Sequence, residues 1–490
     1  MEEVLIRVFS FIWLCIVCLN FSYAQDDIFK HSLLCDMTHI YEDEPGEVDR
    51  LSDIFCNGIF YGRLRSNNFM FNWEDEQTGL NENSTIAAIG GNIIFKSAYF
   101  YGFSFSTGFY TTQAKGSLSD DESYMYKAGK DTFNRYNALN AKNSEIISLA
   151  QSYIEYKQED TYLRVGRQLY TSFLTKSNDT KMIPNSFEGI SLLSKSIPNT
   201  SINMAYLVKQ KLRDHVAFHH LLAYGDSKGD PYSKYTQNDD GAMHRGITLS
   251  KLRNKNIKDR LFVFEVKNSS IDNLDLRMNY STVPKLLSYL MVQTDYRLEV
   301  NDWLVIPGFR YMKQFDDGAG SIAGANLKNL TSAYTNADKL DATLYAARVD
   351  MVKDALKLRL GYTKVSDEAD MVTPWRGFPT GGFTRAMSQY NWYANTQSYM
   401  VQLDYAFESV PDFKIITRYA IQDFDDRKIG VQADSKVFTF DILKSFPVQS
   451  IMLKTRFSHV KGSKQDMLNS ILTKKDPSYD ELRVEINYLF

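Results

Sequence analysis

Residues 481–490, ELRVEINYLF, alternate between apolar and polar side chains, and only Leu489 departs from the pattern. The apolar parity consists of Leu482, Val484, Ile486, Tyr488 and Phe490, and the polar parity of Glu481, Arg483, Glu485 and Asn487. Because successive side chains of a strand point to opposite faces, this segment predicts a strand with one apolar and one charged face. Chain ends fray in soluble sheets, whereas a membrane barrel gives such a strand lipid on one face and water on the other. The segment therefore favours a strand that closes a transmembrane barrel.

The beginning of the sequence predicts export. An apolar run from Val8 to Leu19 is followed by Asn20 and then by Ser22-Tyr23-Ala24. The run is shorter than the about 20 residues that a helix needs to span a bilayer. It therefore predicts a secretory signal peptide over residues 1–24, cleaved after Ala24. Residues 25–50 are acidic and lack alternation, so we interpret them as an N-terminal periplasmic extension, and residues 51–490 as the barrel domain.

Composition excludes several classes of protein. Mean hydropathy is −0.34, and after Ala24 no stretch approaches 18 consecutive apolar residues, which excludes a polytopic helical membrane protein. A barrel distributes its apolar residues by alternation, so a polar average is compatible with membrane residence. The net charge of −3 gives no reason to propose nucleic-acid binding. Cys35 and Cys56 would remain after export into an oxidising compartment, either as a disulfide or as two free thiols.

Alternation recurs along the whole mature chain. It is visible in Tyr99–Phe109, Val292–Val300, Leu356–Tyr362, Tyr399–Phe407, Phe413–Ile421 and Ile451–Phe457. The apolar faces often begin or end in an aromatic residue, as an interfacial girdle requires, and the polar faces carry charges of both signs. Long irregular stretches alternate with short turns. The pattern predicts an all-β protein, a transmembrane antiparallel β-barrel of about 18 strands, each of about 10 residues.

Several blocks of sequence resemble the OprD-type outer-membrane porins, particularly their epsilonproteobacterial branch. The most specific blocks are residues 153–168 (YIEYKQEDTYLRVGRQ), 178–189 (NDTKMIPNSFEG), 206–215 (YLVKQKLRDH), 374–393 (PWRGFPTGGFTRAMSQYNWY) and 412–425 (DFKIITRYAIQDFD). The resemblance implies an 18-stranded barrel whose third outer loop folds inward and constricts the pore. It also implies a row of wall arginines that opposes acidic groups and guides solutes with carboxylates.

The resemblance and the strand parity together predict nine pore-lining or substrate-guiding residues. They are Arg164, Arg167, Asp179, Lys181, Glu188, Arg297, Arg310, Arg359 and Arg418. Charges that faced lipid at mid-bilayer would cost roughly 2–4 kcal/mol for arginine or lysine, so parity assigns them to the lumen. Arg164 and Arg167 have opposite parity, so both face the lumen only if the strand ends or bulges between them.

The function predicted from the sequence is passive diffusion of small hydrophilic solutes (amino acids, peptides or organic acids) through a charged eyelet. A substrate-specific uptake channel and an outer-membrane adhesin or structural protein are the alternatives. Diffusion needs no catalytic residue, cofactor or metal. His215, His219 and His220 resemble a ligand cluster, but His219 and His220 point to opposite faces if residues 217–224 form a strand, so no metal site is predicted there. Expected partners are outer-membrane lipid and lipopolysaccharide of a Gram-negative bacterium, the solutes, and the barrel-assembly machinery through Phe490. The barrel would be a monomer or a trimer.

Overall fold

The computed structural model describes residues 31–74, 79, 81–226, 246–387, 390–428, 431–463, 467–468, 471–472 and 478–490. The predicted signal peptide over residues 1–24 and its cleavage point lie outside these residues. The described part of the predicted extension begins with a small hairpin, and the barrel wall begins at Ile59. Cys35 and Cys56 are free and exposed, so they do not form a disulfide with each other.

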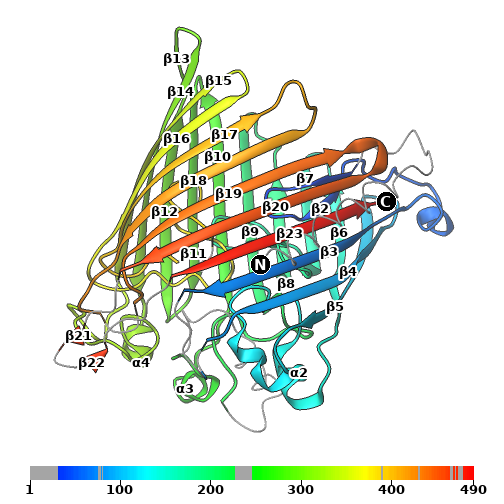
Figure 1. Cartoon of the computed structure of the whole chain (residues 1–490). Coiled ribbons are helices and arrows are strands. Elements are labelled where there is room, and N and C mark those ends of the chain that lie inside the picture. Colours follow the sequence, from blue (N-terminus) through cyan, green and yellow to red (C-terminus); the bar gives the residue numbers. More distant parts are fainter. Residues whose placement is uncertain are drawn as a thin grey trace.

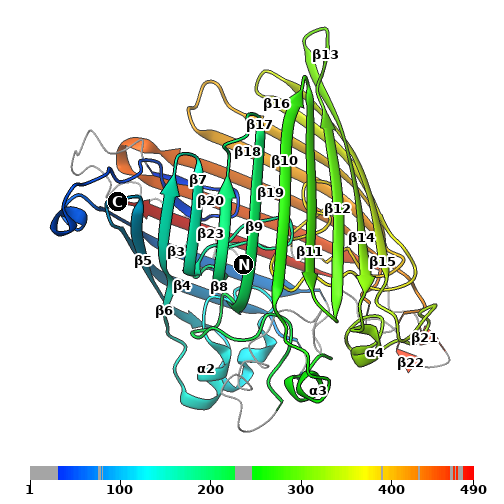
Figure 2. The ribbon, with the colours of Figure 1, turned by 180° about the vertical axis from the view of Figure 1, so that it is seen from behind.

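The wall of the molecule is a closed antiparallel barrel (Figures 1 and 2). Its first half consists of β3 (Ile59–Trp73), β4 (Ser84–Lys96), β5 (Phe103–Gly116), β6 (Ile146–Gln158), β7 (Thr161–Gln168), β8 (Ser186–Ser194), β9 (Thr200–Lys211), β10 (Leu261–Ile271) and β11 (Leu274–Val283). The second half consists of β12 (Leu287–Tyr296), β13 (Leu298–Val300), β14 (Trp303–Asp316), β15 (Ala342–Lys353), β16 (Leu356–Val365), β17 (Gln397–Ala406), β18 (Phe413–Asp423), β19 (Ser435–Phe446), β20 (Ile451–Gly462) and β23 (Tyr479–Leu489). Because β12 and β13 both pair with β14, these 19 strands occupy 18 positions in the ring.

The remaining described elements are small and are not part of the wall. They are β1 (His31–Leu33), β2 (His39–Tyr41), β21 (Met467–Leu468), β22 (Ile471–Leu472), the 3₁₀ turns η1 (Leu51–Ile54), η2 (Asp120–Met125) and η5 (Pro447–Gln449), and the helices α2 (Arg135–Ala141), α3 (Leu249–Asn254) and α4 (Gly320–Ala323). Among the described residues no helix is long and apolar enough to cross a membrane.

Alternation places the apolar parity outside and the charged parity inside, as predicted. In β23 the outward Tyr488 is exposed, whereas the inward Glu481, Glu485 and Asn487 are buried. The prediction of a strand from Tyr99 was wrong, because β5 begins only at Phe103. Tyr101 and Gly102 have φ values of 48° and 77°, so this segment turns the chain between β4 and β5 instead.

The barrel closes between β23 and β3, which pair from Tyr479↔Trp73 to Leu489↔Arg63. Beyond the last pair, the Gly62 amide donates to the carbonyl of Phe490 at 2.7 Å, and the Phe490 amide donates back at 3.0 Å. The Phe490 ring packs where a Cβ on Gly62 would stand, 2.5 Å away, so the small residue makes room for the terminal ring. Strands β3 and β23, which are far apart in the sequence, thereby pair and close the barrel.

The connections at the two ends of the barrel differ in length. The two-residue turns at residues 159–160, 272–273, 301–302 and 354–355 lie at one end, and the long connections that follow β5, β14 and β16 lie at the other (Figure 1). In outer-membrane barrels the short turns are periplasmic and the long loops extracellular. The end of the barrel that carries Phe490 and the β13–β14 turn is therefore periplasmic.

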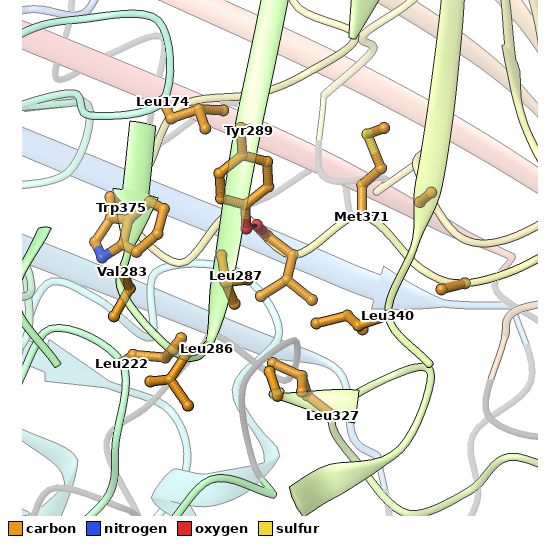
Figure 3. Packing of buried hydrophobic residues seen from close by; sticks show 14 of the residues in the cluster. Leu174, Leu222, Val283, Leu286, Leu287, Tyr289, Leu327, Leu340, Met371 and Trp375 are labelled. Carbon is orange, nitrogen blue, oxygen red and sulfur yellow. Dashed lines mark hydrogen bonds between the residues drawn. The ribbon is translucent and has the colours of Figure 1, made fainter. Parts of the chain in front are cut away.

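Loops from the extracellular end fold back and pack inside the barrel. Leu286 of the β11–β12 turn and Leu287 and Tyr289 of β12 meet Leu327 and Leu340 of the β14–β15 loop, and all five are fully buried (Figure 3). Met371 and Trp375 of the β16–β17 loop and Leu174 of the β7–β8 loop join the same cluster. This apolar core inside the barrel fixes the loops that border the passage.

Candidate functional site

The loop between β7 and β8, residues 169–185 and here called the inward loop, crosses the lumen to the inner face of β3. Its tip carboxylate, Asp179, forms ion pairs with Arg63 and Arg65, at 2.8 Å in the case of Arg65. Arg65 also pairs with Glu485 of β23. The side chains of Arg63 and Arg65 are 0 % exposed and that of Asp179 is 1 % exposed. Water cannot replace these partners, so the pairs fix the tip firmly.

The next inward side chains of β3 continue this attachment. The Asn67 amide donates to the carbonyl of Lys181 at 2.9 Å. The Lys181 ammonium lies 4.2 Å from the centroid of the Phe69 ring, a cation–π contact. Side chains at 63, 65, 67 and 69 share one face because a strand alternates. Residues 179–181 therefore lie along one inner stripe of the wall.

The base of the inward loop pairs with the β16–β17 loop. The amide of Gly377 donates to the carbonyl of Leu174 at 2.9 Å, and the amide of Lys176 donates to the carbonyl of Trp375 at 2.9 Å. A Cβ on Gly377 would stand 2.4 Å from the Leu174 backbone, so only glycine permits this approach. Two inward segments thus brace each other across the lumen.

Arginines follow one another along the wall strands from β11 to β23. These inward residues, here called the arginine row, are Arg277 (β11), Arg310 (β14), Arg348 (β15), Arg359 (β16), Arg418 (β18), Arg456 (β20) and Arg483 (β23). The strands that lack one carry Gln293, Gln402 and Asp441 at neighbouring register positions. The row therefore runs obliquely around more than half of the ring.

Most members of the arginine row are paired with carboxylates of the same wall. Arg359 holds Asp350 through two bonds of 2.6 Å, and Arg456 holds Asp441 through two bonds of 2.7 Å. Further pairs join Arg277 to Glu265 and Arg348 to Asp295, each at 2.7 Å, Arg418 to Asp441 at 3.0 Å, and Arg483 to Glu481. The lumen wall is therefore lined by paired charges of both signs, in which these arginines are partly accessible and most of the carboxylates are buried.

Arg310 differs from the rest of the row. It lies between the rings of Phe173 and Phe383, with ring centroids 4.8 and 4.5 Å from its guanidinium. It donates to the carbonyls of Pro379 and Gly381 and to the Gln293 side chain, and it is buried. Arg310 thus joins the wall to both inward segments, which is a positioning role.

The structure places six of the other predicted site residues in four settings. Arg359 and Arg418 lie in the arginine row, and Asp179 and Lys181 lie at the tip of the inward loop. Arg164 lies on the inner parity of β7, paired with Glu155 and 5.3 Å from the Tyr153 ring. Arg297 lies between β12 and β13 at the periplasmic rim, where it pairs with Asp275 and is 44 % exposed. It is therefore remote from the inward loop.

Arg167 and Glu188 face outward, contrary to the prediction that they line the pore. Register from Ser152↔Arg167 to Gln158↔Thr161 is continuous, so no bulge separates Arg164 from Arg167. Arg167 shares the parity of Leu163 and Val165, which are exposed on the outer wall. There the Glu188 carboxylate bridges Arg167 at 3.5 Å and Lys209 at 3.3 Å.

Sequence reasoning missed several charges that the fold brings to the lumen. They are Arg63, Arg65, Arg277, Arg348, Arg456, Arg483, Glu265, Asp295, Asp350, Asp441 and Glu485. Strand parity carries the signal for Arg456 and Arg483, which oppose apolar residues in their segments. No such signal marks Arg63 and Arg65, because β3 turns Phe69 and Phe71 inward as well.

The histidines of the β9–β10 loop contact one another. His215 Nδ1 and His219 Nε2 are 2.6 Å apart, and His220 lies 3.4 Å from Asp259. Burial, and then the charges of His219 and Lys211, hold the pKa of His215 well below its ordinary value. Within the described residues no group of three or more histidine, cysteine or acidic side chains is arranged to hold a metal.

Comparison with known proteins agrees with this architecture. The model of the outer membrane porin OprD family matches residues 140–490. Among solved structures, OccAB3 of Acinetobacter baumannii superposes with a TM-score of 0.65 at 16 % identity, covering 88 % of this chain and 99 % of its own. OccAB2 of the same organism gives 0.65 at 17 % identity, covering 89 % and 99 %. OpdK of Pseudomonas aeruginosa, solved with vanillate, gives 0.60 at 13 % identity, covering 88 % and 98 %.

The search among curated proteins returned no match. The narrower resemblance to the epsilonproteobacterial branch stays a prediction. The closed 18-position barrel, the charged inner parity and the family match over residues 140–490 point to one conclusion: the chain belongs to the OprD family and is a porin for small solutes in the outer membrane of a Gram-negative bacterium.

Proposed function

We propose that this porin passes small hydrophilic solutes that carry carboxylates, namely amino acids, peptides and organic acids, by passive diffusion. The arginine row supports the proposal, because it offers guanidinium groups at successive positions along the wall. A guanidinium fork matches a carboxylate better than an ammonium does. A solute can thus pass from one arginine to the next without losing all its contacts.

The balance of charges narrows the solute class. Each accessible arginine already has an acidic partner, for example Arg359 with Asp350 and Arg418 with Asp441. The arginines are partly accessible, whereas the side chains of Asp350 and Asp441 are only 3 % and 1 % exposed, so the wall offers a solute carboxylate its guanidinium groups. Binding stays weak because the solute replaces existing partners, and weak binding is required for release. In this proposal the inward loop forms the constriction, with Asp179 and Lys181 anchoring it.

A substrate-specific uptake channel is the second candidate function. The apolar core inside the barrel favours it, because loops that pack together leave a passage of fixed shape. The two functions differ in concentration dependence. Flux through a diffusion channel rises linearly with solute, whereas flux through a specific channel saturates at low concentration.

The first experiment is single-channel recording of the refolded mature protein, residues 25–490, in a planar bilayer under a salt gradient. We expect a stable conductance whose reversal potential moves toward cation preference in Arg359→Gln and Arg418→Gln. Lys436→Gln is the matched control, because Lys436 lies on the outer parity of β19 and is exposed. An inserted, heat-modifiable barrel without conductance would contradict the channel and favour an adhesin or structural role.

The proposal also covers how the barrel is inserted into the membrane and how many copies assemble. Phe490 is offered as the residue that the barrel-assembly machinery reads, and Phe490→Ala is then expected to slow insertion in cells more than refolding in detergent. The oligomeric state is proposed as monomer or trimer, which cross-linking in native membranes would decide.

A further inference from the structure

A short hairpin occupies the periplasmic half of the lumen. Strands β1 and β2 pair from His31↔Tyr41 to Leu33↔His39. This N-terminal hairpin, residues 31–41, belongs to no wall strand, and yet Met37, Thr38 and His39 are buried. Side chains buried inside a channel must be surrounded by other side chains, which the following contacts identify.

The tip of the hairpin contacts the groups that anchor the inward loop. The Met37 carbonyl accepts a hydrogen bond of 2.8 Å from Arg63, the same guanidinium that holds Asp179. The Asp36 carboxylate accepts a hydrogen bond of 3.3 Å from the Asn178 amide in the inward loop itself. The hairpin therefore supports the constriction from the periplasmic side.

Aromatic and polar contacts fix the sides of the hairpin. The His39 ring meets the Tyr61 ring edge-on at 5.1 Å, and the Tyr41 ring stacks on it at 5.6 Å. Glu44 pairs with Lys157, and the amide of Val48 donates to the Tyr99 carbonyl at 2.8 Å, which ties the following residues to the periplasmic turns. These bonds leave the hairpin bound to the side of the wall that carries β3, β4 and β6.

The neighbouring part of the wall, from β18 to β23, leaves space beside the hairpin, and β23 pairs with β3. A cavity of about 380 Å³ lies between Met37 and the inner wall, lined by Lys414, Leu443, Lys454 and Asn487. The Lys454 ammonium lies 3.8 Å from Met37 Sδ, and it forms no ion pair with the residues that the structure describes. A solute that leaves the constriction on this side passes beside the Lys454 ammonium, whereas a second cavity of about 500 Å³, lined by Lys267, Arg277 and Asp295, lies along the wall farther from the hairpin.

We propose that the N-terminal hairpin is a plug that sets the size and charge preference of the periplasmic exit, because it narrows the passage and borders it on the side of Lys454. The inference rests on the proposed function, since it needs a conducting pore. Two strands lie about 4.8 Å apart and are about 10 Å thick, so the hairpin fills roughly 100 Å² of the cross-section. Its removal returns that area to the passage and lets solutes travel away from Lys454.

The test compares single-channel conductance and reversal potential of the full mature protein with a variant that lacks residues 31–43. We expect conductance to rise in the deletion, because the roughly 100 Å² filled by the hairpin joins the passage, and anion preference to fall. Asp36→Ala should change conductance in the same direction, because the bond to Asn178 is lost. Glu42→Ala also removes one negative charge, but from an exposed side chain, and should leave conductance unchanged.

A chemical test uses the protein without deletion. In a Cys56→Ser background, Cys35 at the exposed hairpin turn is modified with a negatively charged methanethiosulfonate, and modification is verified by mass. We expect the current to fall and anion preference to decrease, whereas Cys35→Ser in the same background should not respond.

Unchanged conductance in a folded deletion variant would overturn the proposal, as would complete Cys35 modification without a change in current if the deletion fails to fold. Conductance only in the deletion variant would support the plug and the channel together. No conductance in either variant would refute the proposed function, and the plug with it.

Discussion

The replacement Asp179→Asn tests whether charge holds the inward loop. The substitution keeps the shape of the side chain but removes the negative charge that faces Arg63 and Arg65. Glu485 stays beside Arg65, so one of the two buried guanidinium groups loses its acidic partner. Removal of one partner from a buried ion pair costs about 3–5 kcal/mol, because the remaining charge is uncompensated.

The expected magnitude lies at the lower end of that range. The bond from Asn67 to the Lys181 carbonyl and the pairing of Leu174 with Gly377 do not depend on the charge of Asp179. With a cost of about 3 kcal/mol, the undocked fraction of the inward loop rises about 100-fold, since each 1.4 kcal/mol is about a factor of ten. An undocked loop blocks and unblocks the passage, which recordings detect as excess open-channel noise.

Single-channel recording of Asp179→Asn in planar bilayers is the assay, and Asp121→Asn is the control. Asp121 pairs with Lys142, but its side chain is 80 % exposed, so losing that pair costs about 0–1 kcal/mol. Adding Arg63→Met to Asp179→Asn should reduce the noise, because replacing both partners leaves no unpaired charge. If Asp179→Asn conducts as quietly as the unmodified protein, backbone pairing alone holds the loop and the reasoning fails.

Three further predictions concern the hairpin, the loop contact and the wall. Burial, and then the charges of Arg63 and His31, lower the pKa of His39 to about 3 in the docked hairpin. In an undocked hairpin the pKa of His39 returns to its ordinary value near 6.5, so below that pH the undocked state binds a proton that the docked state does not. Lowering the pH from 6.5 to 5 should weaken docking by about 2 kcal/mol and raise conductance, whereas His39→Phe, which retains a ring against Tyr61, should not respond. Gly377→Val should cost about 1–3 kcal/mol through contact with the Leu174 backbone and raise proteolysis of the inward loop, whereas Gly46→Ala meets open space and should not. Asp350→Asn releases Arg359 and Lys357 from their partner, so blockades by a dicarboxylate should last longer; unchanged blockade times would show that the wall does not bind solute there.

The wall of the barrel could be predicted because lipid imposes one rule on every strand. The alternation in Phe413–Ile421 predicted β18 to within two residues at its C-terminal end, since each outward side chain must be apolar. The rule fails where lipid is not the neighbour. Tyr99 belongs to the periplasmic turn and not to β5, because alternation continued by chance beyond the membrane.

The interior was harder to predict because its contacts join segments far apart in the sequence. Arg63 meets Asp179 only because the inward loop crosses the lumen, and nothing in either segment specifies the other. The hairpin contacts Arg63 through the Met37 carbonyl, and a backbone contact leaves no mark on residue type. The opposite parity of Arg164 and Arg167 did indicate that only one of them faces the lumen unless the strand bulges between them. The strand has no bulge there, so Arg164 faces the lumen and Arg167 faces outward.

The pairing of charges along the wall explains how a charged lumen can bind solutes weakly enough to let them pass. A solute carboxylate reaches Arg359 only by displacing Asp350, so the net free energy is the difference between two similar contacts. Arg310 cannot bind a solute in this way, because two aromatic rings and two backbone carbonyls enclose it. Lys454 differs from the arginines of the row. It borders the cavity beside Met37 and forms no ion pair within the described part of the chain. A carboxylate gains most at Lys454, so charge preference should be set at the periplasmic exit, beside the hairpin, more than along the arginine row.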